Sequence, residues 1–204
     1  TSPGDNFLQE TDTFDTWFSS AQWPYTTLQT GREGDFDRFY PTDVMETGYD
    51  ILPFWVMRML MMGLNKTNEV PFQNVYLHGL VRDAKGQKMS KSKGNTINPL
   101  EIIDQYSADA LRLALVIRSS AGLDKSVGAG DFKAARNFTN KLWNATRFIM
   151  MSEKSDSSGN GDLEYLEKLN TLTKQITKQL DDFKIGLAAE TLYNEFWHWF
   201  CDEC

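Results

Sequence analysis

Cysteine and histidine are scarce in this sequence, and their scarcity limits the metal chemistry open to it. The 204 residues include two cysteines and two histidines. Cys201 and Cys204 form a single Cys-x-x-Cys pair, which supplies half of a four-ligand zinc site, and no second pair completes it. We therefore predict no protein-bound metal. Two cysteines without a secretory signal indicate a reducing, cytoplasmic setting.

Long apolar runs are also missing. No run approaches the ~20 residues that a membrane-spanning helix needs, so we expect no membrane association. The best candidate, residues 51–64, is interrupted by Arg58 and predicts a buried helix instead. The N-terminus shows no basic segment followed by an apolar one, which predicts no secretory signal. It also lacks an initiator methionine, and we expect the chain to begin inside a longer protein.

Positive charge is in deficit, with a formal net charge of −7. This balance argues against a protein that coats nucleic acid by bulk electrostatics. Two segments, residues 82–93 and 132–147, are nevertheless rich in lysine and arginine. Either segment alone is more simply explained as a solvated face. Two of them on an acidic chain indicate local phosphate contacts.

The first part of the chain predicts a mixture of strands, loops and one strong helix. The polar residues 29–41 read as a loop. Short strands are expected at Val44–Glu46 and at 75–79, the second one buried. Between them a helix runs to about Leu64, with Pro53 in its first turn, where a missing N–H costs nothing. A loop rich in glycine and lysine follows from Asp83 to Asn95.

The rest of the chain predicts helices. Apolar residues recur at three- and four-residue steps after Asp131, which indicates a long amphipathic helix. The other expected elements are helices from Pro99, at 108–117, at 163–180 and at 187–200, a flexible break at 122–130 and a surface linker at 152–162. The fold class is therefore α/β over residues 1–118 and all-α over 119–204. We expect these two parts to be different domains.

The loop at Lys88-Met89-Ser90-Lys91-Ser92 carries the chemistry. Two lysines three positions apart, among small hydroxyl residues and close to glycines, form a mobile cationic clamp. Phosphoryl or nucleotidyl transfer needs such fixed positive charge, because negative charge develops on the phosphate oxygens in the transition state. The residues alone leave open a generic phosphate-binding loop, a nuclear-localisation-like basic patch, or an ordinary solvated loop, which is the commonest basis for a basic run.

The spelling Lys-Met-Ser-Lys-Ser resembles the second signature of class I aminoacyl-tRNA synthetases. Further segments resemble the same family and appear in its order: Asp15–Ser20, Glu46–Leu52, His78–Asp83 and 137–145. The resemblance covers nearly the whole chain. It implies the C-terminal half of a Rossmann-like catalytic domain, residues 1–118, followed by a helical-bundle anticodon-binding domain, residues 119–204, which is incomplete.

Within the class, three segments look like the valine-specific enzymes: residues 15–24, 54–64 and 200–202. The resemblance implies a monomeric ligase that activates valine with ATP and Mg²⁺ and transfers it to tRNA(Val). Pro53 departs from the family pattern, in which an apolar, helix-tolerant residue is usual. The alternatives are an isoleucyl or leucyl enzyme, or a non-catalytic tRNA-binding module derived from a synthetase.

The resemblance also assigns roles to individual residues. Lys91 and Lys88 are the expected catalytic residues on the ATP phosphates, Met89 supports the adenine, and Gly48 and Asp50 approach the ribose. Further contacts with ATP are expected from His78, Gly79, Leu80, Ser90 and Ser92. Trp17 and Trp55 are expected to line the pocket for the amino-acid side chain. Structural explanations stand beside these roles: a helix cap for Asp50, a satisfied strand-end histidine for His78, and core packing for both tryptophans. Trp197, Trp199 and Phe200 are expected in the core.

The other class I signature, His-x-Gly-His, is absent, because the only histidines are His78 and His198. We expect the half of the nucleotide-binding fold that carries it to lie upstream of residue 1. The isolated chain is accordingly expected to be inactive. Half of a doubly wound sheet also leaves an exposed edge, which reduces its stability.

Overall fold

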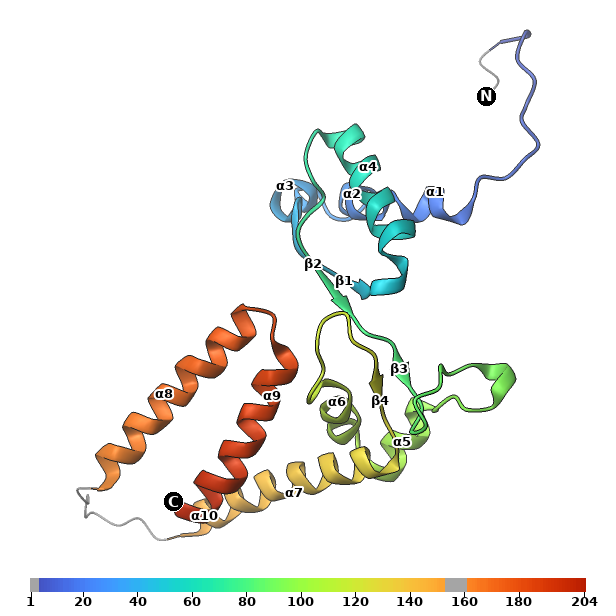
Figure 1. Cartoon of the computed structure of the whole chain (residues 1–204). Helices are drawn as coiled ribbons and strands as arrows, with labels where there is room; N and C mark the ends of the chain where they lie inside the picture. The colour runs from blue at the N-terminus through green and yellow to red at the C-terminus, as the bar shows by residue number, and fades with distance from the viewer. Residues whose placement is uncertain (1–3, 153–160) are drawn as a thin grey trace. The chain divides into compact units, whose positions relative to one another are not determined.

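The computed structural model describes residues 4–152 and 161–204 (Figure 1). The linker predicted at 152–162 falls mainly on residues outside this description. The chain forms two compact units, Thr1–Leu77 and His78–Cys204. The division predicted at residue 118 separates kinds of secondary structure rather than these units, and it stays a prediction.

The first unit combines short helices with a two-stranded sheet. Its strands are β1 (Thr42–Gly48) and β2 (Phe72–His78), which pair with each other, β2 ending where the second unit begins. The helices before β1 are α1 (Thr16–Ser20), α2 (Trp23–Gln29) and α3 (Asp35–Phe39). Because α3 lies within residues 29–41, the prediction that this whole segment is a loop is wrong. Gly34 permits the turn into α3, since its φ of 86° suits glycine.

The helix predicted after Asp50 is present but begins irregularly. It starts with a 3-10 turn, η1 (Tyr49–Ile51), and a π-helical turn, η2 (Leu52–Val56), and continues as α4 (Met57–Thr67). Pro53 lies in the first turn, as predicted. Only one face is covered, with Val56 and Met59 packed on Phe72 of β2. The helix is therefore amphipathic rather than buried, and β2, whose middle residues are exposed, is not the buried strand predicted.

The second unit begins with two short parallel strands. β3 (Val81–Arg82) pairs with β4 (Lys125–Ser126), Val81 opposite Lys125 and Arg82 opposite Ser126. The segment predicted as a flexible break, 122–130, therefore contains an ordered strand. Between the strands lie η3 (Lys91–Lys93), α5 (Pro99–Tyr106) and α6 (Ala108–Val116), and α7 (Ala129–Met151) follows β4.

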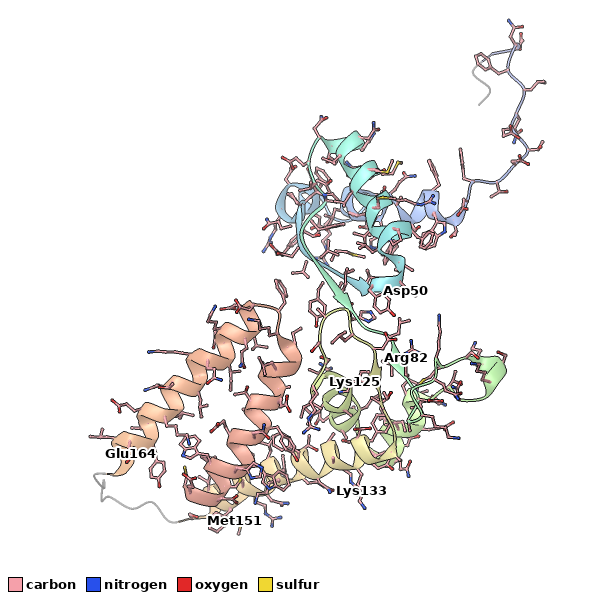
Figure 2. All side chains as sticks on the ribbon, in the orientation of Figure 1. Asp50, Arg82, Lys125, Lys133, Met151 and Glu164 are labelled. Carbon is pink, nitrogen blue, oxygen red and sulfur yellow. The ribbon has the colours of Figure 1, made fainter. Side chains whose placement is uncertain are left out.

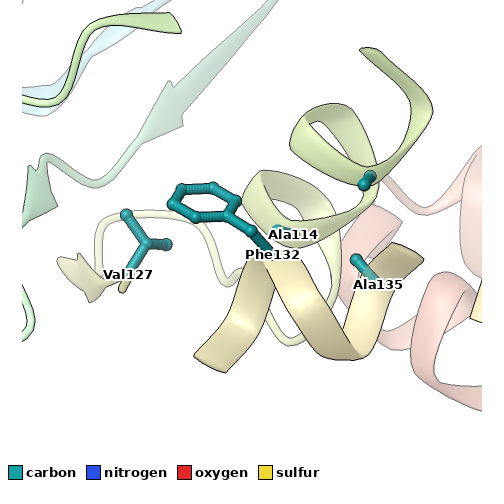
Figure 3. Close-up of a cluster of buried hydrophobic side chains, with 5 residues drawn as sticks. Ala114, Val127, Phe132 and Ala135 are labelled. Atoms are coloured by element: carbon teal, nitrogen blue, oxygen red, sulfur yellow. The ribbon is translucent and has the colours of Figure 1, made fainter. Parts of the chain in front are cut away.

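One apolar cluster holds the elements after β3 together. Phe132 and Ala135 of α7 pack against Ala110 and Ala114 of α6, with Val127 closing the cluster (Figure 3). All five residues are at most 5% exposed. Small residues on α6 let α7 approach closely, so the large ring of Phe132 fills the space between the helices.

The end of the chain is helical, as predicted: α8 (Gly161–Asp181), α9 (Ile185–Asn194), the π-helical turn η4 (Glu195–Phe200) and α10 (Cys201–Glu203). The ring of Phe138 on α7 packs against the rings of Tyr193, Phe196 and Trp197, with distances of 4.5 to 6.3 Å between ring centroids. Trp199 is buried, as predicted, whereas Trp197 and Phe200 are only half-buried. Over the described ranges, no helix combines the length and apolar character needed to span a bilayer.

Candidate nucleotide-binding loop

The loop that carries the paired lysines begins as a tight hairpin at the end of β3. Gly86 N donates to Asp83 O over 2.9 Å, and Asp83 N donates to Gln87 O over 3.0 Å. Gly86 has φ of 76°, a conformation that glycine adopts without steric cost. The turn returns the chain so that Lys88 lies opposite Arg82 in an antiparallel bridge.

The Asp83 carboxylate organises this turn. It accepts hydrogen bonds from Gln87 N at 2.8 Å, from Lys85 N at 3.0 Å and from Asn95 Nδ2 at 2.8 Å. These hydrogen bonds lower the pKa of Asp83 below its ordinary value. The bond from Asn95 has the largest effect, and the bonds from the backbone of Gln87 and Lys85 add to it. An ionised carboxylate is an acceptor only, which suits a site where three donors converge.

Asn95 connects the two arms of the loop. Its Nδ2 donates to Asp83 Oδ2 and to Lys88 O, the latter over 3.3 Å, while its Oδ1 accepts from Ser90 N over 2.9 Å. A single side-chain amide that follows the lysine motif therefore contacts the chain both before the motif and inside it.

The second lysine lies in the short turn η3. Ser90 caps this turn, since its Oγ accepts from Lys93 N over 3.3 Å, and Gly94 ends it with φ of 65°. Lys88, Lys91 and Lys93 are all exposed. The arrangement presents ammonium groups to solvent on an ordered backbone, as an anionic ligand requires.

Met89 anchors the loop to the apolar core of the second unit. Its half-buried side chain packs against the cluster of Phe132, Val127 and their neighbours. This contact explains why an apolar residue stands between charged and polar ones. Support of adenine by Met89 stays a prediction.

The base of the loop is tied to β4 through Asp124. Its Oδ1 accepts from Leu80 N over 2.8 Å, and its Oδ2 accepts from Arg82 Nε over 2.5 Å. Figure 2 shows Arg82 on β3 near the start of the loop. Gly79 lies against the neighbouring backbone, where an added Cβ would stand 1.7 Å from Leu123 O. His78 Nδ1 lies 2.8 Å from Gly79 O, so the strand-end histidine is hydrogen-bonded.

Comparison with known proteins shows the family of the chain. Residues 1–127 match the family described as tRNA synthetases class I (I, L, M and V). The chain belongs to this class I synthetase family. It is 47% identical to the valine–tRNA ligase of Dehalococcoides mccartyi strain CBDB1 over 98% of the chain. It is 44% identical to the valine–tRNA ligase of Clostridium tetani strain Massachusetts / E88 over 97% of the chain.

The solved structures give the same fold. A LeuRS of Agrobacterium radiobacter K84, in a ternary complex with tRNA and LeuAMS, matches 92% of this chain and 28% of its own with a TM-score of 0.76. The identity is 18%, so this likeness shows the fold alone. Both valine–tRNA ligases are longer, and the synthetase chain described here spans 24% of each of them.

The remaining predicted site residues of this synthetase chain lie in the first unit. Gly48 is buried at the end of β1, and Asp50 is exposed in η1 (Figure 2). Asp50 does not cap a helix, because Gly48 holds the position before η1 and no side chain caps it there. The carboxylate is therefore available to a ligand, and its role on the ribose stays a prediction.

The two predicted pocket tryptophans have different surroundings. Trp17 lines a cavity of about 280 Å³ together with Phe14, Arg58 and Met61. Trp55 packs against the buried cluster of the first unit, and its Nε1 donates to Ser20 O over 3.0 Å. Both are half-buried. A shared amino-acid pocket for Trp17 and Trp55 stays a prediction.

Three residues that hold the loop in place were not predicted from the sequence: Asp83, Asn95 and Asp124. One signal was available for the first, since Asp at the start and Gly three positions later are typical of a type I turn. Asn95 and Asp124 act through long-range side-chain contacts that carry no local pattern.

The cysteines do not form a metal site with their neighbours. Cys201 and Cys204 are free thiols. In the part of the chain that the structure describes, no three His, Cys, Asp or Glu side chains are placed to share an ion. The expectation that the protein holds no resident metal stays a prediction.

Proposed function

We propose that the whole protein carrying this chain is a valine–tRNA ligase. It forms valyl-adenylate and pyrophosphate from valine and ATP, and then transfers valine to tRNA(Val). The similarity to valine–tRNA ligases along nearly the whole chain carries this proposal. The intact loop at Lys88–Ser92 supports it, because a pure binding module does not require a phosphate clamp.

The loop contributes electrostatic stabilisation in this proposal. Attack of the valine carboxylate on the α-phosphorus of ATP releases pyrophosphate and places negative charge on the phosphate oxygens. Lys91, with Lys88 beside it, neutralises that charge on an ordered backbone, so little reorganisation is needed during the reaction. Mg²⁺ enters with ATP as part of the substrate. Gly48 and Asp50 bind the ribose, and Trp17 and Trp55 line the valine pocket.

The proposal also covers the helical residues, the oligomeric state and the location of the enzyme. The helical residues 119–204 form part of the anticodon-binding domain, and the enzyme works as a monomer in the cytoplasm, where tRNA is charged. The alternatives are an isoleucyl or leucyl enzyme and a non-catalytic tRNA-binding module. The first differs in the amino acid activated, and the second binds tRNA without activating any.

Amino-acid-dependent ATP–pyrophosphate exchange by the whole protein tests the proposal. Valine, isoleucine, leucine and threonine are offered separately, because neighbouring members of the class share the fold. The highest kcat/KM with valine is the expected result. A higher value with isoleucine or leucine overturns the valine specificity, and tRNA binding without any exchange supports the binding module instead.

A further inference from the structure

We propose that Asn95 and Asp83 are positioning residues that hold the backbone carrying Lys88 and Lys91 in the geometry needed for ATP. We refer to this pair as the Asp83–Asn95 latch. The inference rests on the proposed function, since the latch acts through the lysines of the loop and touches no reacting atom itself.

The latch joins the two ends of the motif. Asp83 precedes the lysines, Asn95 follows them, and their side chains meet at 2.8 Å across twelve positions of sequence. From this junction the Asn95 amide reaches inward to Lys88 O and Ser90 N. Both lysines are thereby fixed, because Lys88 carries one bonded carbonyl and Ser90 directly precedes Lys91.

Besides the latch, the backbone bonds of the hairpin and the Ser90 cap on η3 hold this loop. Its lysines are exposed, and two of its glycines, Gly86 and Gly94, have positive φ. Met89 supplies the main apolar anchor. Fixing the backbone of each residue costs about 1–2 kcal/mol of conformational entropy, and a loop with one half-buried apolar anchor recovers little of this from apolar burial. Hydrogen bonds to an ionised carboxylate are stronger than neutral ones, so the latch is the principal polar restraint on the loop.

The chemistry of the pair fits this role. Asp83 accepts three N–H groups, one from Asn95 and two from the turn of the hairpin. The carboxylate therefore couples the hairpin turn to the residues beyond the motif. Catalysis by fixed charge depends on accurate placement of the charged groups. A residue that holds the backbone of the lysines therefore affects kcat/KM for ATP more than the KM for valine.

Three variants and one control distinguish an effect on the position of the lysine backbone from an effect of net charge. Asn95→Ala removes all three hydrogen bonds of the Asn95 side chain without changing net charge. Asn95→Asp sets a second carboxylate against Asp83. The double variant Asp83→Asn with Asn95→Asp restores a donor and an acceptor at the junction with the original net charge. Asn65→Ala, at an exposed position of α4, is the matched control.

ATP–pyrophosphate exchange by the whole protein is the first readout. We expect Asn95→Ala and Asn95→Asp to lower kcat/KM for ATP about tenfold or more, the loss associated with a buried or charge-assisted hydrogen-bond partner. The KM for valine stays within about twofold. The double variant recovers most of the loss from Asn95→Asp, and Asn65→Ala equals the wild type. Equal effects on ATP and valine, or no recovery in the double variant, overturn the inference.

Hydrogen exchange at the Ser90 amide is the second readout, and it does not depend on activity. This amide donates to Asn95 Oδ1, so Asn95→Ala should accelerate its exchange while the amides of α7 keep their rates. Unchanged exchange at Ser90 overturns the latch. A wild-type protein without exchange of pyrophosphate refutes the proposed function instead, and the amide measurement still decides whether the latch exists.

Discussion

Arg82 and Asp124, 42 residues apart in sequence, form an ion pair that closes the base of the loop just before β4. Both Arg82 Nε and its Nη2 lie 2.5 Å from Asp124 Oδ2. Asp124 also accepts a hydrogen bond from the backbone N–H of Leu80. One carboxylate therefore binds the residues directly before and directly after Val81. The pair is only partly exposed, with side-chain exposures of 33% for Arg82 and 19% for Asp124.

Asp124→Ala should destabilise the second unit by about 1–3 kcal/mol, because it leaves Leu80 N and the Arg82 guanidinium without their partner. Urea denaturation followed by circular dichroism measures the change. Glu190→Ala is the control, since Glu190 pairs with an Arg118 that is 70% exposed, and exposed pairs contribute about 0–1 kcal/mol. Equal losses in the two variants contradict a structural role for Asp124.

Phe132→Ala should lower the free energy of unfolding by about 3–5 kcal/mol, because its ring fills the space between α6 and α7 and leaves a cavity. Phe132 is 1% exposed. Phe148 on the same helix is 75% exposed, and its replacement by alanine should change stability by less than about 0.5 kcal/mol. Thermal unfolding of both variants decides, and similar melting temperatures refute the assigned core.

Gly186→Ala should be strongly destabilising, since the added Cβ would stand 2.0 Å from Ser119 O and 2.4 Å from Ser119 N. Backbone atoms cannot move aside as a flexible side chain can, so α9 must shift away from the end of α6. Gly130 occupies the same second position in α7, and its Cβ would meet nothing within 4 Å. Gly130→Ala should instead be neutral or stabilising by up to about 1 kcal/mol.

Lys125 should make stability depend on alkaline pH. Burial lowers its pKa below 10.5; Asp131 opposes this shift and Arg118 adds to it. The unfolded chain therefore binds this proton more tightly than the folded chain. Between the folded pKa and 10.5 the unfolded state carries more protons, so the contribution of Lys125 to stability rises with pH.

The difference in unfolding free energy between the wild type and Lys125→Met isolates this group. We expect the difference to grow in favour of the wild type as pH rises through the folded-state pKa of Lys125 toward 10.5. In the folded chain Lys125 Nζ donates to Ala114 O over 2.7 Å and also to Ile117 O, contacts that methionine cannot make. Parallel stability curves for the two proteins contradict the lowered pKa.

The sequence predicted the elements whose signal is periodic or compositional. The long helix α7 follows from apolar residues at helical spacing, and the loop of Lys88 and Lys91 follows from its glycines and charges. The helix after Asp50 was found, but its burial was overestimated, because an apolar run does not reveal how many faces have neighbours.

The elements that were missed depend on contacts distant in sequence. β4 has two residues, too few to show a period, and it exists because Val81 and Arg82 pair with it. The short helix α3 stands in a polar stretch that composition assigns to a loop. Asn95 is polar and lies just beyond the lysine motif, and only the fold brings it to Asp83.

ATP–pyrophosphate exchange with valine, measured for the whole protein as wild type, Lys91→Ala and Lys85→Ala, tests whether the lysine loop serves a valine-activating enzyme. Lys85 belongs to the same basic segment but lies outside the lysine motif, and both side chains are exposed. We expect valine-dependent exchange in the wild type and in Lys85→Ala, with a loss of about 10²-fold or more in kcat for Lys91→Ala. A wild type that exchanges nothing with valine, or a Lys91→Ala variant that retains full activity, contradicts this expectation.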